Sequence, residues 1–115
     1  MNVNPLLDEA LTPLLIPVYP DHYIPPPSGG VDEYIVYNYA DERPILRGGG
    51  VDIADETTVQ VHYFTLGDPM PLKKTIQTAL RGAGFTIQSI QQMYESDTHY
   101  YHVIVEAYIC GIIRN

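Results

Sequence analysis

At 115 residues and 12.9 kDa, the chain is long enough for one folded domain with a single hydrophobic core. Hydrophobic residues make up 45% of it, and no apolar run approaches the roughly 18 residues that a membrane-spanning helix needs. Fourteen acidic and six basic side chains give a net charge of −8, which disfavours direct binding to nucleic acid or to anionic membranes.

The N-terminus and the cysteine content predict the compartment. The first ten residues have no basic cluster ahead of an apolar stretch, so they do not resemble a secretory signal. Cys110 is the only cysteine and cannot form an internal disulfide, which agrees with a reducing environment. We therefore expect a cytosolic protein.

The N-terminal segment predicts a short helix. Asn4 is a good capping residue, and Pro5 suits the first helical turn. Leucines recur on one face of this segment, and Pro13 should end the helix near Thr12. An amphipathic helix that packs on a core is expected.

A weak strand and a spacer are predicted next. Residues 16–23 could form a short strand, but Pro17 and Pro20 lack the N–H donors of a central strand, which places it at a sheet edge or in a loop. The run of prolines and glycines at 25–30 is typical of a spacer between this part and the main sheet.

The next segment predicts a strand and a long exposed loop. Residues 33–40 are rich in aromatic and β-branched side chains, which favours a strand, and the charged residues 41–44 are expected to end it. Residues 45–56 contain three consecutive glycines and several acids, a composition that favours an exposed loop over a packed element.

The C-terminal half predicts a strand, a helix and a hairpin. Residues 57–64 alternate between apolar and polar side chains, as a half-buried strand does, and residues 71–83 place apolar side chains on one helical stripe. Residues 85–93 and 99–110 read as two strands joined by a polar turn, which makes an antiparallel hairpin.

This order of elements predicts an α+β fold. We expect one domain, in which residues 1–30 hold the N-terminal helix and spacer and residues 31–110 hold the main sheet and its helix. The expected architecture is an antiparallel or mixed sheet of four to five strands with two helices packed on one face.

Four histidines raise the question of a metal site: His22, His62, His99 and His102. Zinc requires three or four convergent ligands, and the chain has no pair of thiolates to supply them. His62 and His102 could meet only if their strands are neighbours in matching register. We expect exposed or hydrogen-bonded imidazoles and no metal.

No pattern in the chain indicates catalysis or a cofactor. Ser28 and Ser96 lie in predicted turns, and Cys110 has no adjacent base. The triple glycine lacks the Lys-Ser/Thr that completes a phosphate-binding loop, and the acids of residues 52–56 lack the ligand spacing of a calcium loop. We expect neither enzyme activity nor a cofactor, and therefore a protein that acts through its surfaces.

Ten tyrosines are the most unusual feature of the composition. Most lie on or next to predicted strands, on both strand faces. They could form the rim of the core, or they could serve at subunit interfaces, where an amphipathic ring contributes area and one hydrogen bond. The sequence leaves both interpretations open.

Four stretches of the chain resemble the tail-terminator, or tail-completion, family of long-tailed bacteriophages and prophages. The resemblance covers about residues 31–110, and the stretches that carry it are YIVYNYADERP at 34–44, VQVHYFT at 59–65, LKK through ALRGAGFT at 72–86, and YESDT at 94–98. Members of this family have a sheet flanked by two helices and assemble as rings.

The resemblance implies a function and a set of partners. A tail terminator binds the head-proximal end of the tail tube, ends its polymerisation and provides the docking surface for the head. It implies a homo-oligomeric ring, possibly a hexamer, contacts with the tail tube protein and with head-tail connector proteins, and a location in the host cytoplasm and then in the virion tail. No catalytic residue is implied.

The predicted loop at 41–56 is the candidate protein-contact segment. Ring subunits need segments that reach a neighbouring protein, and this loop is long, polar and charged. The side chains expected to make the contacts are Glu42, Arg43, Arg47, Asp52 and Asp55. The alternatives are another head-tail connector or minor tail component, a monomeric adaptor that binds a phage or host protein, and, least favoured, a small enzyme.

Overall fold

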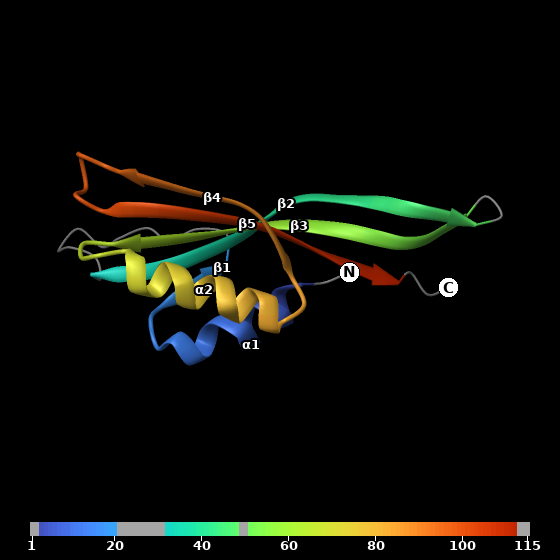
Figure 1. Cartoon of the computed structure of the whole chain (residues 1–115), viewed down its shortest axis with the longest axis horizontal. Helices are drawn as coiled ribbons and strands as arrows, with labels where there is room; N and C mark the ends of the chain where they lie inside the picture. The colour runs from blue at the N-terminus through green and yellow to red at the C-terminus, as the bar shows by residue number, and fades with distance from the viewer. Residues whose placement is uncertain (1–2, 21–31, 49–50, 113–115) are drawn as a thin grey trace.

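The computed structural model describes residues 3–20, 32–48 and 51–112 (Figure 1). In chain order the elements are α1 (Asn4–Leu11), the short 3-10 helix η1 (Thr12–Leu14), β1 (Val18–Pro20), β2 (Glu33–Gly48), β3 (Val51–Thr65), α2 (Met70–Gly82), β4 (Thr86–Tyr94) and β5 (Tyr101–Ile112). The predicted spacer at 25–30 lies outside the described residues, and so do His22 and Ser28.

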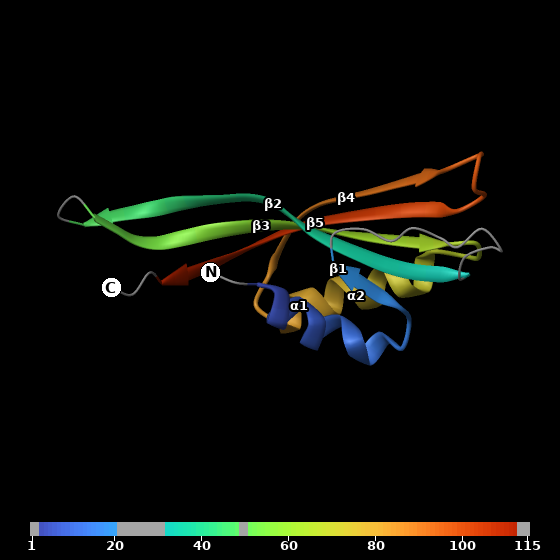
Figure 2. The same ribbon diagram turned by 180° about the vertical axis from the view of Figure 1, so that it is seen from behind.

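The five strands form one mixed sheet in the order β1-β2-β3-β5-β4. β1 pairs with β2 in parallel, and the other neighbours are antiparallel. Both α-helices lie on the same face of the sheet, as the two opposite views show (Figures 1 and 2). The predicted α+β class is therefore confirmed, and the weak N-terminal strand is indeed an edge strand.

The core lies between the helices and the sheet. Because alternate side chains of a strand point to opposite faces, one set of residues from β2, β3 and β5 faces the helices. This set comprises Ile35, Tyr37, Val59, Val61, Tyr63, Val103, Val105 and Ala107, all of them buried. The helices bury Leu7 and Leu11 from α1 and Ile76 and Leu80 from α2 against it.

Some of the tyrosines lie in the interior, and others are exposed. Tyr34, Tyr37, Tyr63 and Tyr100 are buried, whereas Tyr39 and Tyr94 are exposed. Tyr63 donates its hydroxyl hydrogen to Glu33 Oε2 at 2.7 Å, and burial raises the pKa of Tyr63 to about 12. The buried tyrosines therefore serve the folded chain itself, while the exposed rings are accessible to a partner.

The helix ends differ in detail from the sequence-based expectation. α1 begins at Asn4 itself, with Val3 at the capping position and no side-chain cap. α2 ends at Gly82, and Gly84 then adopts a φ of +101°, a conformation that only glycine tolerates well. A Cβ atom at Gly84 would also lie 3.4 Å from Ile109 Cδ1, so the turn packs closely on β5.

The predicted loop at 45–56 is wrong, and so is the predicted turn at 41–44. β2 continues to Gly48, β3 begins at Val51, and the two strands pair up to Gly48 and Val51. Short apolar runs flank the glycines, with Ile45 and Leu46 before them and Val51 and Ile53 after them. This is the pattern of a hairpin, although the segment also carries charged residues. Pro44 is tolerated because β1 pairs only with residues 35–37, which leaves this part of β2 at the sheet edge.

The hairpin makes the molecule elongated, with principal extents of 56 × 26 × 25 Å. Residues 41–48 and 51–56, hereafter the arm, extend past the part of the sheet that the helices cover (Figure 1). The C-terminal end of β5 supports the base of the arm, since Ala54 pairs with Ile112. No helix within the described ranges is long and apolar enough to cross a membrane.

Replacement of Ile76 by alanine should test the helix-to-sheet core. The Ile76 side chain is fully buried, so its truncation leaves a cavity and should lower the free energy of unfolding by about 2–5 kcal/mol. Thr78→Ala on the exposed side of the same helix is the matched control and should change it by less than about 0.5 kcal/mol. Urea denaturation measures both, and equal effects would contradict this assignment of the core.

Candidate protein-interaction surfaces

The arm brings all five predicted contact residues together on two paired strands. The register pairs Glu42 with Thr57, Pro44 with Asp55 and Arg47 with Asp52. Arg43 Nη2 lies 2.9 Å from Asp41 Oδ2, and Arg43 Nε lies 4.0 Å from Glu56 Oε1 across the strands. The pairing of Arg43 with Asp41 and its approach to Glu56 were not predicted from the sequence.

The β2 strand of the arm is exposed to solvent at its start. Asp41, Glu42, Arg43 and Pro44 are all exposed. Beyond Ala54, the last residue of β3 that pairs with β5, the arm has only two strands, and two-stranded ribbons alone are marginally stable in water. Contact with another protein would supply the burial that the arm lacks.

The face of the sheet opposite the helices, hereafter the outer face, is buried at Tyr34 and Val36 and half-buried at most of its positions on β3 and β5. Because of the two-residue period of a strand, it carries the side chains that alternate with the core residues. They include Tyr34, Val36 and Asn38 from β2, Gln60, His62 and Phe64 from β3, and His102, Ile104 and Glu106 from β5. Rings and amides dominate this surface, and Gln60 Nε2 donates to Glu106 Oε2 at 3.2 Å.

Aromatic rings form a packed cluster at one end of the outer face. The rings of Tyr34 and Phe64 stack with centroids 4.7 Å apart, and Phe64 stacks on His102 at 4.1 Å. Tyr100 meets Tyr34 edge-on at 5.7 Å. Such ring pairs contribute about 0.5–1.5 kcal/mol each beyond the area that they bury, so the cluster stabilises this end of the sheet.

Two of the four histidines meet beside the aromatic cluster. β3 and β5 are neighbours, and their register places His62 diagonally opposite His102 on the same face. His62 Nδ1 lies 2.8 Å from His102 Nε2, His62 Nε2 lies 3.1 Å from Asn38 Oδ1, and His102 Nδ1 lies 3.4 Å from Glu95 Oε2. The two histidines therefore lie on neighbouring strands in the register that their contact requires.

The contacts of this pair limit how many protons it can hold. With one excess proton, His102 donates to both Glu95 and His62, and His62 donates to Asn38, so each contact joins a donor to an acceptor. A second proton would place two N–H groups against each other at the 2.8 Å contact. Burial lowers the pKa of His62, with a further decrease from His102; burial also lowers that of His102, although Glu95 opposes the change.

The other reactive side chains lie apart from this pair. His99 adopts a φ of 65° in the turn before β5, and its Nδ1 lies 3.0 Å from the Tyr94 hydroxyl. Cys110 is a free, exposed thiol near the C-terminal end of β5. Within residues 3–20, 32–48 and 51–112, no three His, Cys, Asp or Glu side chains converge as a metal would require.

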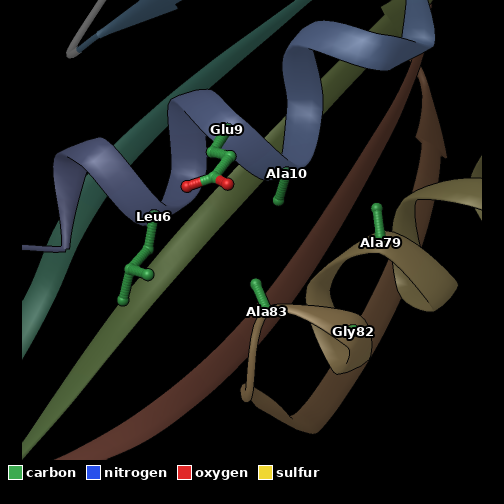
Figure 3. Close-up of a pocket in the computed structure, with 6 residues that line it drawn as sticks. All are labelled: Leu6, Glu9, Ala10, Ala79, Gly82 and Ala83. Atoms are coloured by element: carbon green, nitrogen blue, oxygen red, sulfur yellow. The ribbon is translucent and has the colours of Figure 1, made fainter.

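A groove runs between the two helices on the other side of the molecule. Figure 3 shows α1 and α2 facing each other across it, and its lining residues are Leu6, Glu9, Ala10, Ala79, Gly82 and Ala83. The small residues of α2 allow the helices to approach, and Glu9 is the one ionisable side chain of this lining. The groove thus reflects helix packing and does not assemble a set of reactive groups.

Comparison with known proteins gives no assignment. No protein-family model matches the chain, and no curated protein sequence matches it significantly.

The histidine pair predicts a dependence of stability on pH. Both pKa values are lower in the folded protein than the ordinary value of about 6.5, so the unfolded chain binds more protons in the range below that value. The contribution of the pair is complete above about pH 6.5 and is lost as pH falls from there through the lowered pKa values. Urea titrations between pH 7.5 and 5 should show this loss.

Replacement of the pair isolates its share of the effect. His62→Gln/His102→Gln should flatten the pH dependence over this range, whereas the exposed control His99→Gln should retain it. An unchanged slope in the double variant would assign the effect to other groups.

Proposed function

We propose that the protein is a structural subunit of the tail of a long-tailed bacteriophage or prophage. It acts as a tail terminator, which caps the head-proximal end of the tail tube, ends tail polymerisation and provides the docking surface for the head. The resemblance of residues 31–110 to that family supports the proposal, and so does the fold, a sheet with two helices on one face.

The arm is the observation that carries the proposal. It extends past the helix-covered core, and its charged residues lie at fixed register positions along two paired strands. Ordering the end of the arm beyond Ala54, where only two strands pair, costs conformational entropy. An arm of this kind is suited to a chain that is completed by a neighbouring protein, as the subunit of a ring is.

The proposal defines a set of partners and a location. The first partner is a second copy of the chain, in a closed homo-oligomeric ring such as a hexamer. The tail tube protein and the head-tail connector proteins contact the two surfaces of that ring. Assembly takes place in the host cytoplasm, and the mature protein resides in the virion tail. Catalysis, cofactors and direct nucleic-acid binding have no part in this function.

A monomeric adaptor is the second candidate, because the same exposed arm could bind a different protein with no ring. The two candidates differ in solution mass. Light scattering after size exclusion, over a range of concentrations, should show a discrete oligomer several times larger than 12.9 kDa for a ring subunit. A monomer at every concentration would favour the adaptor.

Shortening the arm should weaken assembly and leave the fold intact. In the variant, Asn-Gly replaces residues 45–54, so that the paired residues Pro44 and Asp55 are joined by a two-residue turn. The helix-to-sheet core is untouched, so cooperative unfolding should persist while the oligomer dissociates at a higher concentration. Oligomers of unchanged stability would show that the arm makes no subunit contact.

Tail tubes test the function itself. Tubes polymerised from the tail tube protein encoded beside this chain should acquire a cap at one end when the protein is added, and their mean length should fall. Electron microscopy measures both. Uncapped tubes of unchanged length would overturn the terminator proposal, whatever the oligomeric state of the protein.

A further inference from the structure

The charges of the chain are divided unequally between the two sides of the molecule. All fourteen acidic side chains lie outside residues 70–94, the segment that contains α2 and β4. The same segment carries Lys73, Lys74 and Arg81, three of the six basic side chains. Although the whole chain has a net charge of −8, this segment is positive.

The fold collects this segment on one side. β4 is the last strand of the sheet, and α2 packs near β4 and β5, whereas α1 packs against α2 and β1. The side formed by α2 and β4 is hereafter the basic side. The opposite side, formed by α1 and β2, exposes the acidic residues Asp8, Asp41 and Glu42 together with Arg43, which pairs with Asp41, and is hereafter the acidic side.

The two edges of the sheet differ in their protection against strand pairing. β1 is three residues long and ends at Pro20, with Pro17 just before it, which are features that block an edge. β4 contains no proline and no charged residue, and it pairs regularly with β5 from Ser89 to Tyr94 after a bulge. Natural edge strands usually carry lysine, proline or a further bulge to prevent association, and this stretch of β4 does not.

Large apolar side chains are exposed along this edge. Ile90 is 39% exposed, Met93 42% and Tyr94 52%. Between two acidic molecules, an uncharged strand beside a positive helix is the place where the surfaces can approach with the least repulsion. The edge of β4 therefore combines unpaired backbone, apolar area and favourable charge.

From this arrangement we infer that the basic side of one copy binds the acidic side of the next, with β4 alongside the outer edge of β2 at residues 38–48. β1 pairs only with residues 35–37 of β2, so residues 38–48 have an edge that no described strand covers. The inference rests on the proposed ring, whose subunit contact it identifies. The arm, at the acidic side, thus reaches toward the neighbouring copy.

Charge also selects between the two ways in which copies could pair. If β4 paired with β4 of a second copy, the basic residues of two α2 helices would lie together and repel each other. Contact between the basic and acidic sides brings opposite charges together instead. Such a contact joins two different patches, so it can repeat from copy to copy and close a ring, whereas β4 with β4 would stop at a dimer.

Two charge-reversal variants test the interface in the absence of tail tubes. The first is Lys74→Glu/Arg81→Glu on exposed positions of α2, and the second is Asp41→Lys/Glu42→Lys on β2. Each variant alone should raise the concentration needed for assembly by roughly tenfold or more, because like charges then face each other. An equimolar mixture of the two variants should recover assembly, since each supplies the complementary side to the other.

Control variants separate this effect from net charge and from folding. Lys74→Gln/Arg81→Gln should weaken assembly less than charge reversal does, and Asp97→Lys in the β4–β5 turn should leave it unchanged. Circular dichroism of every variant checks that the fold persists. Amides of residues 89–94 should become protected from hydrogen exchange as the protein assembles.

Three results would overturn the inference. The first is a wild-type chain that stays monomeric at its highest soluble concentration. The second is assembly at an unchanged concentration by the Asp41→Lys/Glu42→Lys variant. This result is expected if β4 pairs with β4 of a second copy. The third is a failure of the mixture to recover assembly. Tubes that remain uncapped by an intact ring would overturn the proposed function alone, so the two failures are distinguishable.

Discussion

The pairing of β3 on both of its edges is the constraint on which the rest of the structure depends. β3 pairs with β2 on one side and, from Ala54 to Thr65, with β5 on the other. Its strict alternation places Val59, Val61 and Tyr63 under the helices and leaves His62 and Phe64 on the outer face. One strand therefore defines the core, the aromatic cluster and the base of the arm, and a shift of one residue would exchange its two faces.

The sequence predicted the elements that have a strong local pattern. The period of two in residues 57–64 and the apolar stripe of residues 71–83 correspond to β3 and α2 because burial on one face produces both the pattern and the structure. The arm was missed because its glycines and acids suggested a loop, whereas ladder hydrogen bonds extend both strands to Gly48 and Val51. Propensity was outweighed by pairing with a neighbour.

The surfaces were less predictable than the elements. The contact between His62 and His102 depends on strand order and register, which no local pattern in either strand reveals. The charged residues of the arm could be named from composition, but their pairing across two strands could not. The absence of acids from residues 70–94 was visible in the sequence, yet it gained meaning only when α2 and β4 were found on one side of the molecule.

The position of β5 has a consequence for how the chain folds during synthesis. β2 and β3 are adjacent in sequence, so their ladder closes a short loop at little entropic cost and can form early. β5 leaves the ribosome after the other described strands, and until it arrives the second edge of β3 is unpaired along Val59, Val61 and Tyr63. Until β5 is made, the nascent chain therefore exposes the hydrophobic, unpaired edge of β3, the strand that lies at the centre of the finished sheet. Such an edge favours association with other chains, so prompt completion of translation reduces aggregation.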